Sequence, residues 1–428
     1  MLIKFARFIL CQFMAAGRLS IAVGDGPYHH IIAKKDGPHA AIRLAHKGIL
    51  WRLILQPDLA FGEAYMDGDL IVKDDKLDDL MALLLENVKH WQTHWLARSV
   101  LALDTSFARF SILNFPGRSK RNVAHHYNLK DGLFDTFLDP WRQYSCAYFL
   151  TPDDSLADAQ ITKLARIAAK LRLQPKDNVL DIGYGWGGLA YALAAVEPKA
   201  TITGLTLSEN QHGFACSSIK QAGMAAASVA TRVSYELRDY RHQTGQFDKI
   251  VSVGMLEHVG AQHFQSYFAT IARLLAPDGL ALIHSIGVSR APHRCNHLIN
   301  KYIFPGGYLP SLEQMTAAAS KQGLKIIDIE VMTGHYEKTL QKWRHAFFKN
   351  ISNVQNHYDE KFIRMWEFYL VGCEYFFRSQ AGMVFQIQLG HDYNAAPLTR
   401  RYISQQEDHY RDLLCKTTLF GNIPPSKT

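Results

Sequence analysis

The stretch 180–188, LDIGYGWGG, constrains the fold of this chain more than any other segment. An apolar run ends in a glycine-rich turn and a helical pattern begins at Leu189, which predicts a buried strand, a turn and a helix. Gly183, Gly185 and Gly187 let the backbone approach a ligand without a clash from a Cβ atom. Amides of the loop and of the first helical turn would face that ligand.

Apolar strands alternate with helical periods through the rest of the chain, which is typical of a parallel α/β sheet. The strands expected around the loop are 178–183, 201–207, 233–239, 248–255 and 279–287, with helices at 208–223 and 262–275. Two further segments, 324–332 and 383–391, can add strands at one edge. The helix-patterned stretch 338–380 between them is expected to cover one end of the sheet.

The glycine loop alone could equally bind a dinucleotide. Asp181 stands two residues before the first glycine, where its carboxylate can reach the cationic amino acid end of S-adenosylmethionine (AdoMet). A dinucleotide site expects an acid about 20 residues further on to hold the ribose. The next two strands end instead in Thr206, Ser208, Gln211, Asp239 and Tyr240. Each glycine alone could serve a tight turn, but three aligned strand ends that carry polar residues favour AdoMet.

The length of 428 residues allows two to three domains. Residues 18–90 mix short apolar runs with turn signals and predict a small α+β unit, with an amphipathic helix over 77–84. The stretch 113–121 combines proline, glycine and basic residues, as a linker does. We therefore expect an amino-terminal domain at 1–112, a linker at 113–121, a catalytic domain at 122–395 and a carboxy-terminal extension at 396–428.

The composition of the chain limits the kinds of molecule that it is expected to bind. The net charge of +8 suits nucleic acid, an anionic membrane or an acidic substrate, although a basic solvated surface has the same composition. The chain lacks the (N/D)PP(Y/F) string of nucleic-acid methyltransferases, so no nucleic-acid partner is expected. No apolar run approaches the roughly 18 residues of a membrane span. The six cysteines are scattered without a CxxC pair, which predicts neither disulfides nor a metal site and favours the cytoplasm.

Several long strings carry a resemblance to a known family. They include FGEAYMDGDL (61–70), FLDPWRQYSCAYF (137–149), LDIGYGWGGLA (180–190), GLTLSENQ (204–211), VSVGMLEHVG (251–260), HSIG (284–287), NKYIFPGGYLPS (300–311) and HYEKTLQKW (335–343). With them the chain resembles the cyclopropane fatty acid synthase and mycolic acid cyclopropane synthase family from about Gly62 to His391. The resemblance implies a class I AdoMet-dependent methyltransferase sheet, which is Rossmann-like, behind a small amino-terminal α+β domain. The match inside that domain implies the bacterial phospholipid type.

The resemblance also implies an activity. The enzyme would transfer a methylene group from AdoMet to the double bond of an unsaturated acyl chain of a membrane phospholipid, with a bound bicarbonate as the base. It implies a homodimer that associates peripherally with the inner face of the membrane. Two alternatives stay open: methylation or methylenation of the chain without ring closure, and a non-catalytic lipid-binding protein.

By motif, the bicarbonate cradle falls on Cys146, Glu257, His284, Ile286 and Tyr336. The AdoMet contacts fall on Tyr144, Ser145, Leu180, Asp181, Gly183, Gly185, Gly187, Thr206, Ser208, Gln211, Asp239 and Tyr240. Each of these could have an ordinary structural role, but Glu257 and His284 both follow parallel strands at their carboxyl ends, where α/β sheets bind ligands. The sequence departs from the family pattern at Asn128, where an aspartate is usual, and at Tyr184, where a cysteine is common.

Overall fold

A computed structural model describes residues 10–93, 131–221, 229, 231–289 and 293–417. The described residues form two compact units. The amino-terminal unit contains the described residues up to 93 together with 296–303 and 350–379, and the second unit contains the remainder. The expected linker lies outside the described residues, and the boundaries at 112, 121 and 395 stay predictions.

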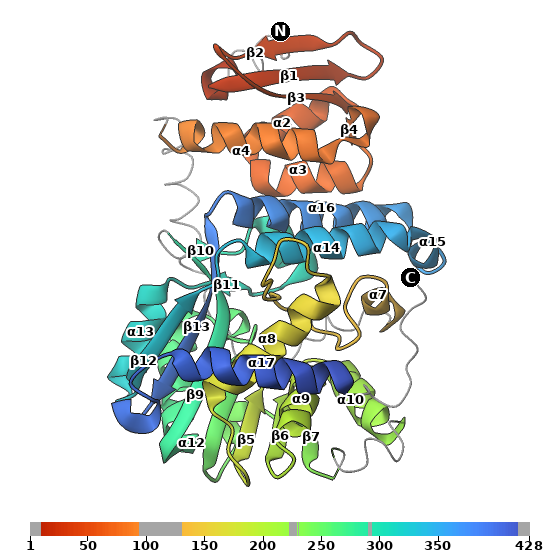
Figure 1. Ribbon diagram of the computed structural model, residues 1–428. Coiled ribbons are helices and arrows are strands. Elements are labelled where there is room, and N and C mark those ends of the chain that lie inside the picture. Colours follow the sequence, from red (N-terminus) through yellow and green to blue (C-terminus); the bar gives the residue numbers. More distant parts are fainter. Residues whose placement is uncertain (1–9, 94–130, 222–228, 230, 290–292, 418–428) are drawn as a thin grey trace. The chain divides into compact units, whose positions relative to one another are not determined.

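The second unit is built on a mixed sheet (Figure 1). Among the residues described, seven strands follow the order β12-β13-β9-β8-β5-β6-β7. Their bounds are β5 Asn178–Ile182, β6 Thr201–Thr206, β7 Val233–Leu237, β8 Phe247–Val253, β9 Leu275–Val288, β12 Lys325–Val331 and β13 Gly382–Gly390. Only β13 runs against its neighbours, β9 and β12. Because β5 pairs with β6 on one side and β8 on the other, the strand order reverses at β5, where open α/β sheets bind ligands.

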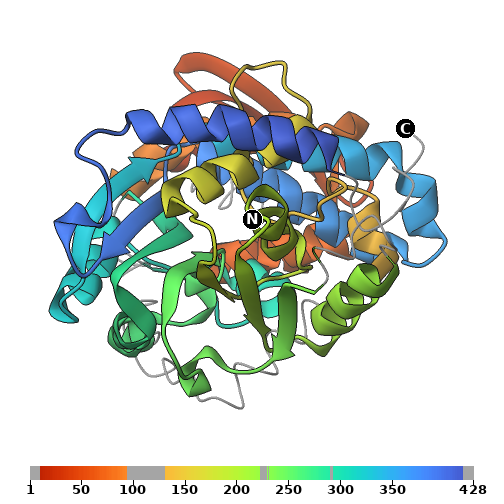
Figure 2. The same ribbon diagram turned by 60° about the horizontal axis from the view of Figure 1, so that its bottom comes forward.

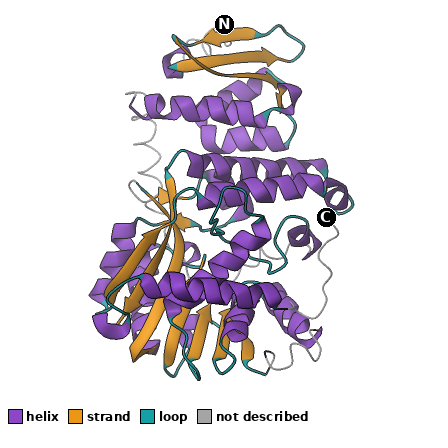
Figure 3. Cartoon of the chain, in the orientation of Figure 1, coloured by secondary structure: helices purple, strands orange, loops and turns teal. Residues whose placement is uncertain are grey.

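Helices cover both faces of this sheet, as Figure 3 shows. The helices of the second unit are α7 Asp131–Asp135, α8 Leu156–Leu171, α9 Gly188–Val196, α10 Glu209–Gln221, α12 Phe264–Leu274, α13 Leu312–Lys321, α14 His335–Lys349 and α17 Arg401–Lys416. One core packs α8, α9 and α17 against the sheet, and the other packs α12 and α13. In Figure 2 the deep blue α17 lies along the yellow α8. Sheet residues alternate between the two cores, with Val179 in one and Leu180 in the other.

Side-chain caps fix the starts of two of these helices. The Ser155 hydroxyl accepts from the Asp158 amide at the start of α8. Ser311 and Gln314 form a reciprocal capping box at the start of α13. Such caps satisfy amides that have no partner inside the helix and contribute about 1 kcal/mol each.

The amino-terminal unit packs helices against a small sheet. Within the described part of this unit, four strands follow the order β2-β1-β3-β4, with bounds β1 Ala16–Val23, β2 His29–Ile32, β3 Lys35–Leu44 and β4 Leu70–Val72. Its helices are α2 Lys47–Leu55, α3 Pro57–Met66, α4 Leu77–Thr93, α15 Ile351–Gln355 and α16 Glu360–Arg378. The Tyr65 hydroxyl of α3 donates to Glu367 of α16 at 2.7 Å, and Val371 and Tyr375 of α16 join the core of this unit.

The strands expected from the sequence are confirmed to within four residues at each end, and the edge placement of β12 and β13 is confirmed. The predicted helix at 77–84 continues to Thr93 as α4. The stretch 338–380 forms α14, α15 and α16, but only α14 belongs to the unit that holds the sheet. The second half of that stretch therefore belongs to a different unit from the sheet it was expected to cover. No helix among the described residues has the length and apolar composition that crossing a bilayer requires.

Replacing two glycines of the loop after β5 by alanine should lower the free energy of unfolding by different amounts. Both have a positive φ, +60° at Gly185 and +92° at Gly187. A Cβ on Gly185 meets no atom within 4 Å, whereas one on Gly187 would lie 2.6 Å from the Tyr235 hydroxyl oxygen. We expect Gly185→Ala to cost about 1 kcal/mol of unfolding free energy through backbone strain alone. Gly187→Ala should cost at least about 1 kcal/mol more in urea unfolding, and equal costs would contradict the crowding at Tyr235.

Candidate active site

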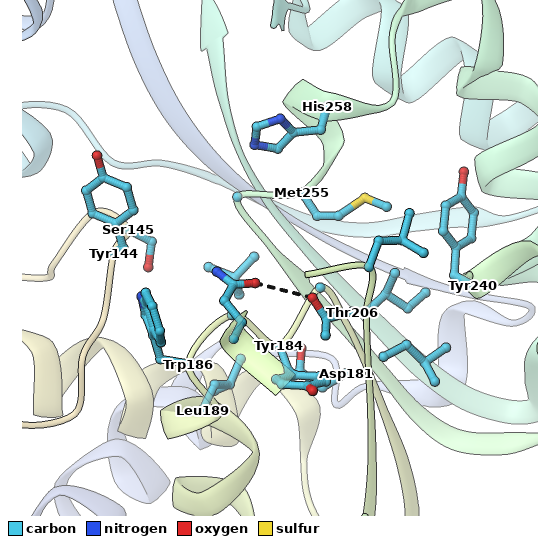
Figure 4. A pocket seen from close by; sticks show the side chains of 18 of the residues that line it. Tyr144, Ser145, Asp181, Tyr184, Trp186, Leu189, Thr206, Tyr240, Met255 and His258 are labelled. Atoms are coloured by element: carbon cyan, nitrogen blue, oxygen red, sulfur yellow. Dashed lines mark hydrogen bonds between the residues drawn. The ribbon is translucent and has the colours of Figure 1, made fainter. Parts of the chain in front are cut away.

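A pocket lies over the carboxyl ends of β5, β6 and β8 (Figure 4). Its walls come from the loop before α8, the glycine loop and the ends of three strands. The predicted AdoMet residues that line it are Tyr144, Ser145, Asp181, Gly183, Gly185, Thr206, Gln211, Asp239 and Tyr240. In Figure 4, Tyr144, Ser145 and Trp186 lie on one side of the pocket and Tyr240 on the other, with Asp181 at its base.

Asp181 is a fully buried carboxylate in this pocket. Within the described chain neither of its oxygens has a hydrogen-bond partner. Burial raises the pKa of Asp181 to about 7, and the nearby Lys163 ammonium opposes that rise. A buried carboxylate without partners is costly, so this position suits a ligand that brings a positive charge and N–H donors.

Lys163 of α8 holds the loop that forms the opposite wall. Its ammonium is fully buried and donates to Gln143 Oε1 at 2.6 Å and to Ser145 Oγ at 2.9 Å. The carboxylate of Asp139 accepts from the amides of Trp141 and Gln143 at 2.8 and 2.9 Å. The loop that carries Ser145 is therefore fixed by charge-assisted hydrogen bonds.

The side chains at or just after the ends of β6 and β7 differ in their hydrogen-bond partners. Thr206 Oγ1 donates to Gln211 Oε1 at 3.2 Å, which turns both side chains toward each other in the pocket. Asp239 is paired with Arg241, whose hydrogen bonds, against the effect of burial, keep the pKa of Asp239 below its ordinary value. Tyr240 packs edge-on against Tyr267 at 5.5 Å between ring centroids.

Three predicted residues do not line the pocket. Leu180 faces the core between the sheet and α12. Gly187 begins α9 in close contact with Tyr235, and the Ser208 hydroxyl caps α10 by accepting from the Gln211 amide. Their places indicate that they shape the site through the backbone.

A second group of polar residues begins beside the pocket, at Glu257. Met255 and His258 on either side of it line the pocket, while the Glu257 carboxylate is buried. Its Oε1 accepts from the Ile286 amide at 2.6 Å, and Oε2 has no partner in the described chain. Burial raises the pKa of Glu257 to about 7. The structure thus joins two of the predicted cradle residues, Glu257 and Ile286.

The other cradle residues lie on neighbouring elements. His284 is on β9, two residues before Ile286, and its Nδ1 lies 3.2 Å from Gln386 Nε2. Cys146 follows the loop held by Lys163, and the next amide, Ala147, donates to Thr339 Oγ1 of α14 at 3.0 Å. Tyr336 is buried on the same helix, α14, one turn before Thr339. No contact described here joins all five residues, so the complete cradle stays a prediction.

Comparison with known proteins identifies the family. The profile of the family described as mycolic acid cyclopropane synthetase matches residues 116–387. The chain belongs to that family. It is 35% identical over 356 residues to the cyclopropane-fatty-acyl-phospholipid synthase of Escherichia coli K12, covering 83% of this chain and 89% of that protein. It is also 35% identical to the tuberculostearic acid methyltransferase UfaA1 of Mycobacterium tuberculosis, over 75% of this chain and 76% of that protein.

Solved structures of the family have the same fold as the matched part of this chain. The cyclopropane synthase MmaA2 of Mycobacterium tuberculosis superposes with a TM-score of 0.59 at 31% identity, over 63% of this chain and 97% of that one. The mycolic acid cyclopropane synthase CmaA1, solved with SAH and CTAB, gives a TM-score of 0.58 at 33% identity and the same coverage. The expected Rossmann-like methyltransferase fold is confirmed, and the protein is an AdoMet-dependent methyltransferase.

The synthase family site contains residues that the sequence analysis missed. Lys163 and Gln386 carry no local signal, because each lies in the middle of a helix or strand and not at a strand end or in a motif. Arg142 lies inside the family string 137–149 and lines the pocket, with its guanidinium carbon 3.7 Å from the centroid of the Phe214 ring. His258 could have been found, since it follows Glu257 directly; burial lowers its pKa to about 4, so it is neutral at pH 7.

The state of Asp181 predicts how AdoMet affinity depends on pH. The pKa of about 7 means that the carboxylate loses its charge as the pH falls through 7. The amine of AdoMet, with an ordinary pKa of about 7.7–8.0, stays mostly cationic up to about pH 7.5. We expect the affinity measured by calorimetry to rise between about pH 6 and 7.5, and Asp181→Asn to weaken binding at least about tenfold at pH 7.5. The variant should also lose this pH dependence, and an unchanged profile would contradict the role of Asp181.

Proposed function

We propose that this protein transfers a methylene group from AdoMet to the double bond of an unsaturated acyl chain of a membrane phospholipid, and forms a cyclopropane fatty acid. The resemblance to the Escherichia coli synthase supports the substrate class, because the match extends over 83% of this chain. The product named for that relative is carried over here as part of the proposal.

The geometry of Glu257 carries the chemical part of the proposal. In the sequence Glu257 stands between two residues that line the pocket, Met255 and His258, and one oxygen of its buried carboxylate has no partner in the described residues. A buried acceptor beside a methyl donor is what removal of a proton from the transferred carbon requires. An ordinary methyl transfer to an oxygen or nitrogen needs no acceptor at that carbon.

Ring formation begins at the alkene. The electron pair of the alkene forms a bond to the sulfonium methyl carbon, the bond from that carbon to sulfur breaks, and S-adenosylhomocysteine leaves. The remaining alkene carbon becomes a cation. A base removes a proton from the added methyl, and the electrons of that C–H bond close the ring. The protein must hold the methyl close to the alkene and exclude water from the cation.

We assign the base to a bound bicarbonate ion held by Glu257, His284 and Tyr336. The partnerless Oε2 of Glu257 supports this assignment, because it can accept from the hydroxyl of such an ion. The Ile286 amide already donates to Glu257 Oε1, so we assign it the role of orienting Glu257. Burial raises the pKa of the Cys146 thiol well above its ordinary range, which argues against a thiolate nucleophile and leaves this residue to shape the wall.

We also propose that the protein works at the inner face of the membrane from the cytoplasm, as a homodimer. The net charge of +8 supports attraction to anionic lipid headgroups. Three of the basic residues, Arg118, Lys120 and Arg121, stand in the predicted linker, which lies outside the described residues.

The alternative is transfer without ring closure. It is favoured by the relatives named a tuberculostearic acid methyltransferase and, in Pseudomonas putida, a probable fatty acid methyltransferase, at 35% and 36% identity. In that reaction the cation loses a proton from a neighbouring chain carbon and leaves a methyl-branched alkene, or a hydride shift first moves the cation to the branched carbon, and loss of a proton from the added methyl then leaves a methylene branch. The placement of the proton acceptor then decides between the products.

Replacing Glu257 tests the cradle. We expect Glu257→Gln to bind AdoMet as the wild type does but to lose at least about 100-fold in turnover, because the single amide oxygen can accept from Ile286 only and an NH₂ donor replaces the second acceptor oxygen. Release of S-adenosylhomocysteine with unsaturated phosphatidylglycerol vesicles is the measurement. Glu313→Gln, at an exposed position of α13, is the matched control and should keep full turnover. Wild-type turnover in Glu257→Gln would remove the assignment.

The product distinguishes the two reactions. Incubation with labelled AdoMet and a phospholipid of one defined cis double bond should yield a lipid heavier by one CH₂ that ozone does not cleave. A methylene branch has the same mass but keeps an alkene, so ozonolysis before mass spectrometry separates them. A cleavable product would support the alternative.

A further inference from the structure

The side chain of Gln386 contacts the predicted cradle residue His284. The two residues are register partners on the antiparallel strands β13 and β9, so their side chains leave the same face of the sheet. Gln386 Nε2 lies 3.2 Å from His284 Nδ1. Gln386 is 1% exposed and His284 is 2% exposed, so this hydrogen bond is shielded from water.

A buried lysine fixes which end of the Gln386 amide faces the histidine. The ammonium of Lys170 on α8 donates to Gln386 Oε1 at 2.7 Å. An ammonium only donates, so the amide oxygen must face Lys170 and the NH₂ group must face His284. The amide NH₂ also only donates, so His284 Nδ1 must accept. A neutral imidazole whose Nδ1 accepts carries its proton on Nε2.

Burial lowers the pKa of Lys170, and the Glu330 carboxylate opposes that effect and holds the ammonium in place. Lys170 also donates to the Glu330 carboxylate of β12, which is paired with Arg166 as well. Although burial opposes it, the hydrogen bonds from Arg166 and Lys170 hold the pKa of Glu330 at about 2. The anion therefore persists at every physiological pH and anchors the ammonium.

We propose that Gln386, oriented by Lys170, is a positioning residue that holds His284 in the neutral form with its proton on Nε2. The inference rests on the proposed function, in which His284 donates from the ring to an oxygen of the bound base. A histidine with the opposite tautomer would present a lone pair to an anion and repel it. The hydrogen bond at Nδ1 thus decides whether the other ring nitrogen can bind an anion.

The charged groups around the ring favour the same state. Lys163 and Lys170 approach from α8 and Glu330 from β12. Burial and the two ammonium groups, against Glu330, lower the pKa of His284 to about 3. The wild-type ring is therefore neutral through the working pH range, and its tautomer is set by hydrogen bonding rather than by pH.

Gln386→Glu provides a test with a definite sign. A carboxylate at this position only accepts, so Nδ1 must carry a proton and the pKa of His284 must rise. Below that pKa the ring is an imidazolium that still donates from Nε2, whereas above it the single proton stays on Nδ1 and Nε2 becomes an acceptor. We expect turnover to fall at least about tenfold as the pH rises through this new ionisation. The wild type should lack this ionisation, and Gln386→Glu should bind AdoMet with the affinity of the wild type.

Two further variants separate positioning from stability. Gln386→Leu should lower kcat about tenfold or more with no new ionisation, because the ring loses its tautomer restraint without gaining an acceptor. Gln388→Glu is the matched control on the same strand and face. Gln388 is also 1% exposed and donates to the Lys170 carbonyl at 2.6 Å. It should lose stability but keep the wild-type pH profile.

A readout without turnover keeps the test independent of the reaction. In protein labelled with ¹⁵N in the imidazole rings, the His284 signals are identified by their loss in His284→Asn. The wild type should show one protonated and one unprotonated ring nitrogen, with Nε2 protonated, and Gln386→Glu should show a protonated Nδ1. A wild-type proton on Nδ1, or an unchanged pH profile in Gln386→Glu, would overturn the inference. The correct tautomer in a protein that forms no ring would instead count against the proposed function alone.

Discussion

A buried carboxylate without a partner stands at the point where the strand order of the sheet reverses. Asp181 has neither a hydrogen bond nor solvent in the described chain, and such a group destabilises the empty protein. Under the assignment of this pocket to AdoMet, the glycine loop, the strand ends and α8 surround the place of the cationic end of the ligand. The free energy lost by burying the carboxylate is then recovered when that cation binds, and the pocket discriminates by charge as well as by shape.

Helix α8 supports the two halves of the site with two buried ammonium groups. Lys163 and Lys170 are seven residues apart, which places them two turns apart on the same face of the helix. The first fixes the loop with Ser145 beside AdoMet, and the second fixes Gln386 beside His284. One rigid helix thereby holds the methyl-donor pocket and the proposed proton-accepting region in a constant relation, which a reaction between two tightly placed carbons requires.

The relatives share different lengths of this chain. A cyclopropane mycolic acid synthase of Mycobacterium tuberculosis matches 60% of this chain but 92% of its own length, whereas the Escherichia coli enzyme matches 83% and 89%. The family profile matches residues 116–387, so the first 115 residues, which include the described strands and helices of the amino-terminal unit up to residue 93, lie outside that match. The amino-terminal unit has its own core, in which α16 from residues 360–378 packs against α3 and α4. A segment late in the sequence therefore completes an early unit.

The sequence by itself determined the strand–glycine–helix segment, the seven strands of the sheet and the residues at the strand ends, because these follow from local periodicity and from glycine's freedom at positive φ. It also placed Asp181 and Glu257 at the ligand edge, since the carboxyl ends of parallel strands meet there. Only the tertiary structure decided that α16 joins the amino-terminal unit and that Gln386 faces His284. Both depend on contacts between residues about 100 or more positions apart, which no local pattern records. Apolar periodicity shows that a face is buried, but the partner that covers it is chosen by the packing of the whole chain.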